Sequence, residues 1–442
     1  MRQEPDKEKR KTRRQVRRSN AKLYPIYKMF SWDLLFFYAI EFLFYTITKK
    51  ITAPQVLIVN ASYLIFKIIM QIPAVTISEA IGKKRCMILG NIFVAIYIIL
   101  IIFLPGLPGL IIATIFQALG YDMKTISESN LLYDSVATHG GEGLYSKLDA
   151  KGGSMYYIFD GITSLIAGYL FIINNYLPMV VCLASIVISI IIACHFEDVY
   201  QPKKRNISIK KQLKETKHDL GASFKYIFKS ERMKALFMFM IVFYGFIKVI
   251  ETYRSELLVS SGVSEENYAI IFAMLTFIAG LALTCKEKIE KTFKNRTLTF
   301  LSLTYIGACV IVGLVASTVP NNKIVVPIVI LMYMAMKMCT SVWYILEYKY
   351  LKNFTNHKNR EKITFTYEFV AAISGSILAL IGSLILEKVK VQHAYLIVST
   401  VALASMLMVL KYMKTRIGLK PEEYKKEDIE FEITEEKEQK NQ

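Results

Sequence analysis

QIPAVTISEAIGKKRCMILG, residues 71–90, joins two long apolar runs of the chain. A proline, an acid and a glycine interrupt the hydrophobic pattern, and three consecutive bases follow the glycine. Glycine and proline favour turns, and charged side chains avoid hydrocarbon. The stretch therefore predicts a tight, charged hairpin between two membrane-spanning helices. The residues that mark it are Pro73, Glu79, Gly82, Lys83, Lys84 and Arg85.

Apolar runs recur along the whole chain of 442 residues, of which 54% are hydrophobic and 21% charged. A helix of about 20 apolar residues crosses the ~30 Å hydrocarbon core of a bilayer. The pattern predicts an all-α membrane protein with twelve transmembrane helices in two six-helix halves. The predicted spans are 30–48, 55–78, 86–104, 109–135, 152–174, 177–195, 233–258, 267–285, 297–318, 324–347, 363–386 and 392–411.

The longest internal polar segment separates the two halves, and a charged tail lies at each end. Within this segment Leu213, Leu220, Phe224 and Ile227 follow helical spacing between lysines, which predicts an amphipathic helix on the membrane surface. The N-terminal tail has almost no apolar residues, so we expect it to be disordered. The predicted regions are a basic cytoplasmic tail (1–28), an N-terminal half (29–195), a cytoplasmic central loop (196–232), a C-terminal half (233–414) and a charged cytoplasmic tail (415–442).

The basic residues are distributed very unequally between the two sides of the membrane. Of the 55 Lys and Arg residues, 45 fall in the tails and loops on the side of the N-terminus, and five fall in loops on the other side. Cytoplasmic loops carry the excess of Lys and Arg. We therefore expect a multi-pass protein of the plasma (inner) membrane with both termini cytoplasmic. The excess of basic residues in the cytoplasmic tails and loops then explains the net charge of +19, and we expect no nucleic acid partner.

No motif indicates an enzyme, a metal centre or a cofactor. The six cysteines are scattered without a CxxC or Cys/His spacing, and most lie inside apolar runs. Neither HExxH nor GxSxG occurs. We expect no cofactor, no metal and no catalytic residues.

The hairpin motif resembles the signature of the major facilitator superfamily. In that signature an acid stands three residues before a glycine that is followed by bases, with a proline nine residues before the glycine, as Glu79, Gly82 and Pro73 do here. Val75 replaces the first glycine of the family pattern, and Ala80 replaces a base. The segment SESNLLYDSV, 127–136, is similar to a bacterial subgroup of exporters whose fourth span ends in Leu-Tyr-Asp-Ser.

Twelve ionisable residues fall inside the predicted spans. At about 3 kcal/mol each for unpaired central placement, they would be very costly in lipid, so they must face protein or water. In the resembled fold, spans 1, 4, 7 and 10 line a central cavity, and the scaffold spans 3, 6, 9 and 12 carry none of these charges. Asp122 is one of the twelve, and the other eleven together with Tyr121 are the candidates for the cavity or for coupling. These candidates are Asp33, Glu41, Lys67, Tyr121, Lys124, Glu128, Asp160, Lys248, Glu251, Arg254, Lys337 and Glu368.

Helical spacing groups several of these candidates. On span 1, residues 33 and 41 are about 80° apart on a helix, so both acids can face one cavity. Spans 4 and 7 predict ion pairs along one helix face, in the first case between Lys124 and Glu128 and in the second among Lys248, Glu251 and Arg254. For both spans a structural ion-pair network is as good an explanation as substrate contact.

The acids of spans 5 and 11, and four further acids, complete the charge pattern. Asp160 and Glu368 are each followed by small residues, which suggests equivalent positions in a repeat. Asp122 lies about 200° from Lys124 on span 4, away from the expected pair. We expect ordinary interface or capping charges at the membrane edges, namely at Asp134, Asp149 and Glu347.

The resemblance implies a secondary active transporter of a small molecule that works by alternating access. The hairpin residues 73–85 would latch the cytoplasmic side in one state, with Glu79 pairing with the end of span 11. Desolvation favours the neutral form of a carboxylic acid, so buried acids are candidate proton carriers. We expect proton-coupled export of an amphipathic or drug-like compound by a monomer in contact with membrane lipids. The alternative is a nutrient or metabolite importer, and a non-transporting sensor is less favoured.

Overall fold

The computed structural model describes residues 13–136, 141–200, 209–293, 296–318, 325–353 and 360–414, and in these ranges the ordered elements are helices without strands. The elements are α1 (Arg13–Ser31), α2 (Glu41–Leu43), the π-helix η1 (Phe44–Thr48), α3 (Ala53–Ile81), α4 (Lys83–Phe103), α5 (Gly106–Val136), α6 (Gly141–Ile173), α7 (Leu177–Cys194), α8 (Ile209–Lys229), α9 (Glu231–Ser260), α10 (Glu265–Thr284), α11 (Lys286–Phe293), α12 (Thr297–Thr318), α13 (Val325–Asn353), α14 (Arg360–Lys388) and α15 (Val391–Lys414).

The hairpin of residues 71–90 is formed by α3 and α4 with a single residue between them. Gly82 has φ 90°, a backbone conformation that side chains disfavour, and it ends α3 just before α4 begins. The backbone N–H of Lys84 donates to Asp198 Oδ1 at 3.0 Å, and the Lys83 side chain forms an ion pair with Asp134 on α5. We call the end of the bundle that carries this hairpin the hairpin side, and the other end the far side.

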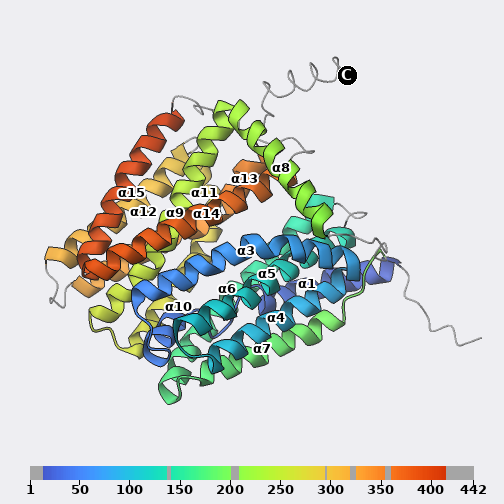
Figure 1. The fold of residues 1–442 in the computed structure, drawn as a ribbon, viewed down its shortest axis with the longest axis horizontal. Helices are drawn as coiled ribbons and strands as arrows, with labels where there is room; N and C mark the ends of the chain where they lie inside the picture. The colour runs from blue at the N-terminus through green and yellow to red at the C-terminus, as the bar shows by residue number, and fades with distance from the viewer. Residues whose placement is uncertain are drawn as a thin grey trace, which may run out of the picture.

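The helices form two halves that meet along a cleft. In Figure 1 the first half, α1 to α7, lies in blue to green and the second, α9 to α15, in yellow-green to red. The halves contact each other mainly through α3 with α14 and through α6 with α10. Helix α8, in the predicted central loop, packs on the hairpin side against α3, α9 and α14. Lys362 on α14 donates to Asp219 on α8 at 2.8 Å, which ties this linker helix to the second half.

The predicted continuous span 30–48 is wrong, because the chain leaves the helix after Ser31 and becomes helical again only at Glu41. Local hydrogen bonds and long-range contacts hold the interrupted segment, residues 32–40. The Lys124 ammonium donates to the carbonyl of Ser31, and Asp33 Oδ1 accepts from its neighbour Leu34 N–H at 3.1 Å. Phe36 has φ 66°, which is incompatible with a right-handed helix. Such irregular backbone is tolerated at membrane depth where it lies in protein or lines a cavity.

The expectation of a disordered tail is also wrong for residues 13–28, which lie in α1. This helix packs against α5, α6 and α7. Tyr24 and Tyr27 are fully buried in a cluster with Leu131 and Phe196, so apolar contacts hold the basic helix on the first half. Residues 1–12 and 415–442 of the predicted tails lie outside the described residues.

Ten of the described helices are long and apolar enough to cross a membrane. The predicted first and fourth spans are not among them. The first is interrupted, as described above. The fourth corresponds to α5, which has 31 residues but contains Asp122, Lys124 and Glu128, and these lower its apolar content. The charges that single out the site therefore also weaken the hydropathy signal of the helix that carries them.

Candidate functional site

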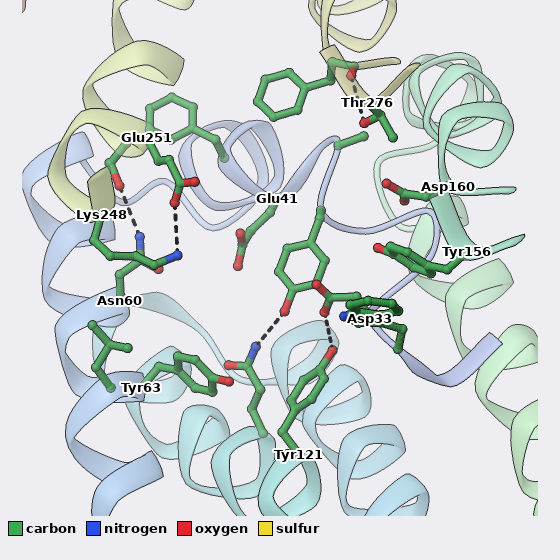
Figure 2. Close-up of a pocket in the computed structure, with 18 of the residues that line it drawn as sticks. Asp33, Glu41, Asn60, Tyr63, Tyr121, Tyr156, Asp160, Lys248, Glu251 and Thr276 are labelled. Carbon is green, nitrogen blue, oxygen red and sulfur yellow. Dashed lines mark hydrogen bonds and ion pairs between the residues drawn. The ribbon is translucent and has the colours of Figure 1, made fainter. Parts of the chain in front are cut away.

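A cavity of about 710 Å³ lies between the two halves and contains most of the charges inside the bundle. It is large enough for a small organic molecule, because ligand pockets usually measure about 300–1,000 Å³. Its walls come from the interrupted segment after α1 and from α2, α3, α5, α6, α9 and α10, with one residue each from α1, η1, α13 and α14. Figure 2 shows Glu41 between the Lys248–Glu251 pair on one side and Asp33 and Asp160 on the other.

The two halves touch on the far side of this cavity. Asn60 Nδ2 on α3 donates to Thr252 Oγ1 on α9 at 3.2 Å. The hydroxyl of Ser383 on α14 donates to the carbonyl of Pro54, at the start of α3, at 2.9 Å. Toward the hairpin side the cavity continues between side chains such as Glu128 and Asp149. The cavity is thus closed off at the far side and extends toward the hairpin side.

The acid Asp33 is held in the interrupted segment by α5. The hydroxyl of Tyr121 donates to Asp33 Oδ1 at 2.5 Å, and Lys124 Nζ lies 4.2 Å from the centre of the Tyr121 ring. Tyr121 and Lys124 are three positions apart on α5, so both side chains reach the interrupted segment from one face of that helix. Helix α5 therefore fixes the interruption and the carboxylate that it presents to the cavity.

An aromatic cluster lies beside Asp160, an acid on α6 that lines the same wall of the cavity as Asp33. Trp32 stacks on Tyr156 at 5.6 Å between ring centres, and Tyr156 and Tyr157 meet edge to face at 5.5 Å. All three rings and Asp160 line the cavity. Tyr156 is four residues before Asp160, so the carboxylate and the ring share one face of α6. This wall combines negative charge with aromatic faces.

The opposite wall carries bases from the second half. Lys248 and Glu251 form the predicted ion pair on α9 at 3.1 Å. Arg254, the third member of the predicted stripe, instead stacks its guanidinium over Phe272 at 4.9 Å from the ring centre. Its Nε is buried and has no hydrogen-bond partner in the described part of the chain. Lys337 on α13 completes this wall.

Ten of the twelve candidates for the cavity line it. These ten are Asp33, Glu41, Lys67, Tyr121, Glu128, Asp160, Lys248, Glu251, Arg254 and Lys337. The other two candidates, Lys124 and Glu368, are not lining residues. Lys124 is buried and bonded to the Ser31 carbonyl, so the predicted Lys124–Glu128 ion pair is not formed within the described residues. Glu128 Oε2 has no hydrogen-bond partner there.

The predicted equivalence of Asp160 and Glu368 does not extend to their environment. Asp160 faces the cavity, whereas the charge of Glu368 interacts with that of Lys67 at the interface between α14 and α3. Asp122 on α5 interacts with the same lysine and is buried. Lys67 thus lies close to two acids, one from each half.

The hairpin residues lie apart from the cavity. Pro73 is inside α3, and Glu79 is exposed in its last turn. Lys83 is engaged with Asp134, and Arg85 is exposed on α4. These positions fit a surface element that the opposite half could contact, and they exclude direct contact with a molecule in the cavity.

All three acids that we expected to be ordinary edge charges have partners, and that of Asp134 is Lys83, as described above. Asp149 lines the cavity, where it forms an ion pair with Lys28 and accepts from Tyr24 OH at 2.9 Å. Glu347 is buried and accepts from Tyr367 OH at 2.6 Å. The sequence contained no local signal for either contact, because the partners lie on other helices.

Reversing the ion pair of the second wall gives a first prediction. Lys248→Glu alone would place two acids side by side, so we expect a protein with transport reduced by at least about tenfold, since two like charges in contact at a half-buried site repel by about 1.4 kcal/mol or more. The double variant Lys248→Glu with Glu251→Lys restores the pair and should recover much of the flux. An equally inactive double variant would show that the order of the two charges matters, and a fully active single variant would contradict a role for the pair.

The described residues contain no group of three or more His, Cys, Asp or Glu side chains placed to hold a metal ion. The cavity therefore offers charge and hydrogen bonds, and the described lining shows no metal centre. Ionic and aromatic contacts are the chemistry that this site can use to bind a molecule.

Comparisons with known proteins agree with this architecture. A family model of the Major Facilitator Superfamily matches residues 29–351. No curated protein matches the sequence significantly. Among solved structures, the nucleoside transporter NupG is similar with a TM-score of 0.68 at 11% identity, covering 90% of this chain and 99% of that one.

Two further structures have the same fold. A D-xylose-proton symporter gives a TM-score of 0.63 at 12% identity, covering 90% of this chain and 97% of that chain. A POT family transporter in complex with a thioalcohol-conjugated peptide gives 0.65 at 13% identity, with 90% and 95% covered. At these identities the likeness concerns the fold alone.

Proposed function

This chain belongs to the Major Facilitator Superfamily, and we propose that it is a proton-coupled secondary active transporter that moves a small solute by alternating access. The observation that carries the proposal is the cavity between the halves, which is closed at the far side and lined by acids and bases from both halves. A midplane site between two halves is what alternating access requires.

The orientation of the protein follows from its basic loops. The hairpin side carries the α3–α4 bases and helix α8, so the positive-inside rule supports a cytoplasmic hairpin side in the plasma membrane. In this orientation the structure represents an inward-facing state. The return to the outward-facing state would close the hairpin side, where Glu79 and its neighbours could contact the second half.

We propose export of an amphipathic organic compound. The cavity wall combines charges with the rings of Tyr63, Tyr121 and Tyr156, which suits a solute with both polar groups and an apolar body. Import of a metabolite is the second candidate. It is favoured by the density of charge in the cavity, because a purely lipophilic drug would leave these groups without partners.

The proposal is tested in liposomes that contain the purified protein and carry an imposed pH gradient. A mixed library of small metabolites is added, and the compounds that accumulate inside are identified by mass spectrometry. We expect accumulation of at least one compound that depends on the gradient and disappears with a protonophore. The direction of the effective gradient distinguishes export from import. No gradient-dependent accumulation of any compound would contradict transport of this kind.

The two acids of the first predicted span, Asp33 in the interrupted segment and Glu41 at the start of α2, are the proposed proton carriers. Asp33→Asn and Glu41→Gln each remove one titratable group, and we expect at least one of them to abolish gradient-driven accumulation. Exchange of labelled solute without a gradient should persist in Glu41→Gln, because the neutral isostere preserves the shape of the site. Unchanged coupling in both variants would exclude the two acids as proton carriers.

The hairpin is proposed as a latch of the outward-facing state. Glu79→Gln should leave the amount of folded protein unchanged and lower flux by about tenfold or more, because one charged contact is worth on the order of 1.5–3 kcal/mol. Flux is measured in the liposome assay above. Glu266→Gln, at the exposed start of α10, is the control. Normal flux in Glu79→Gln would refute the latch.

A further inference from the structure

The acids and bases that line the cavity are distributed unequally between the two halves. Two ion pairs, Lys28 with Asp149 and Lys248 with Glu251, are each formed within one half. Among the other described lining residues, the first half contributes four acids and one base, and the second half contributes two bases. These residues are Asp33, Glu41, Glu128, Asp160 and Lys67 on the first half, and Arg254 and Lys337 on the second. None of them forms an ion pair within the described chain.

The acidic wall has the features of an ammonium site. Asp33 and Asp160 both line the cavity and lie on the same side of Glu41 in Figure 2, and their charges interact with each other. Tyr156 and Tyr157 border the same space and interact with both acids. An ammonium group is stabilised by carboxylates and by the faces of aromatic rings. Trp32 in this cluster already has a cation, Lys28 Nζ, 4.1 Å from its ring centre.

The basic wall has the features of a site for an acidic group. The Arg254 side chain is positioned by Phe272 and keeps its buried Nε without a partner. Lys337 Nζ has no ion-pair partner among the described residues, and its charge interacts first with that of Glu251 on its own half and then with that of Asp160 across the cavity. Arginine and lysine are the side chains that bind carboxylate and phosphate groups. The two kinds of site therefore face each other from opposite halves.

We propose that the cavity binds a zwitterion, a small organic compound whose ammonium group lies between Asp33 and Asp160 beside Tyr156 and whose acidic group contacts Lys337 and Arg254. This inference rests on the proposed transport function and names the class of its solute. A compound with a single charge would leave one wall uncompensated at membrane depth, and a neutral compound would leave both. A zwitterion also joins the halves through its two ends, which favours closure around it.

The experiment sorts the compounds that accumulate in the liposome assay by charge. Matched triads are added to the library, each with an amino acid, the amine that lacks its carboxylate and the acid that lacks its amine. We expect gradient-dependent accumulation to be confined to compounds that carry both an ammonium and an acidic group. Accumulation of neutral or singly charged compounds instead would overturn the zwitterion while leaving the proposed function intact. No accumulation of any compound would overturn both.

Two variants test where the ammonium group and the acidic group of the zwitterion bind. Lys337→Gln should lower accumulation of the zwitterion by about tenfold or more, toward the level of the matched amine, because the contact it removes is charge-assisted. Asp160→Asn should lower accumulation of the zwitterion toward the level of the matched acid. Lys390→Gln and Glu266→Gln, which change exposed residues outside the cavity, are the controls. Accumulation of the zwitterion at the wild-type level in both variants would overturn the proposed position of its two ends.

Thermal unfolding of the purified protein measures binding of the compound and does not depend on the coupling of transport to a proton gradient. The zwitterion that accumulates should raise the melting temperature of the wild type, and its single-charge analogues should raise it much less. Lys337→Gln should reduce the shift to the value found for the amine. An equal shift from all members of the triad would contradict recognition of both charges.

Discussion

Replacement of Gly168 by leucine is expected to abolish transport and to leave the protein open at the far side. Gly168 on α6 faces Ala269 on α10, and a Cβ atom at position 168 would lie 2.1 Å from the Ala269 Cβ. This is far below a van der Waals contact, so the two helices cannot approach as they do here. Overpacking costs on the order of 3 kcal/mol, which lowers the population of the closed far side about 100-fold. Flux in liposomes should fall accordingly.

The matched control is Gly307→Leu on α12, because no atom lies within 4 Å of a Cβ built at that position. A rescue variant combines Gly168→Ala with Ala269→Gly, which moves the methyl group from α10 to α6. This exchange keeps the total volume of the contact, and we expect it to recover flux that Gly168→Ala alone loses. Full activity of Gly168→Leu would show that the α6–α10 contact is not needed in the transport cycle.

Lys124→Met is expected to destabilise the protein and to impair transport, although Lys124 does not line the cavity. Its ammonium is the donor to the Ser31 carbonyl, where α1 ends inside the bundle. Loss of a partner for a buried polar group costs about 1–3 kcal/mol. The same change removes the cation next to the Tyr121 ring, whose hydroxyl holds Asp33. We expect lower resistance to chemical unfolding and a loss of gradient-driven flux of about tenfold or more, as for one charged contact.

Lys288→Met, an exposed lysine on α11, is the control for the loss of a lysine. A second variant, Tyr121→Phe, removes the hydroxyl that bonds Asp33 and keeps the ring beside Lys124. It should affect flux more than stability, because the Ser31 carbonyl keeps its donor. A Lys124→Met protein with the stability and flux of the wild type would contradict the view that this lysine holds the interruption in the first span.

The features that local chemistry determines could be predicted from the sequence. Gly82 between an apolar run and three bases predicted the α3–α4 hairpin, because a positive φ at a helix end favours glycine. Lys248 and Glu251 predicted their ion pair, because residues three apart meet on a helix surface. The cost of charge in lipid predicted that Asp33, Glu41 and Asp160 face an internal site, and all three line the cavity.

The interruption of the first span could not be predicted in this way. Residues 30–48 are apolar enough to suggest one helix, and the groups that end it come from α5, 93 residues away for Lys124 and 88 for Tyr121. Contacts of this kind depend on the packing of helices, which a periodic pattern does not contain. The same reason explains why Asp149 was mistaken for an edge charge, since its partner Lys28 lies 121 residues away on α1.

The central claim, alternating access of the cavity, is tested most directly by distances between spin labels on the two halves. One pair, at positions 147 on α6 and 288 on α11, reports on the hairpin side, and the other, at Ile173 and Ser261, reports on the far side. Both pairs are placed in a protein whose six cysteines are replaced. We expect two populations in each distance distribution that shift in opposite directions, and Gly168→Leu should favour the open far side. Single distances that remain the same in all variants would contradict the account.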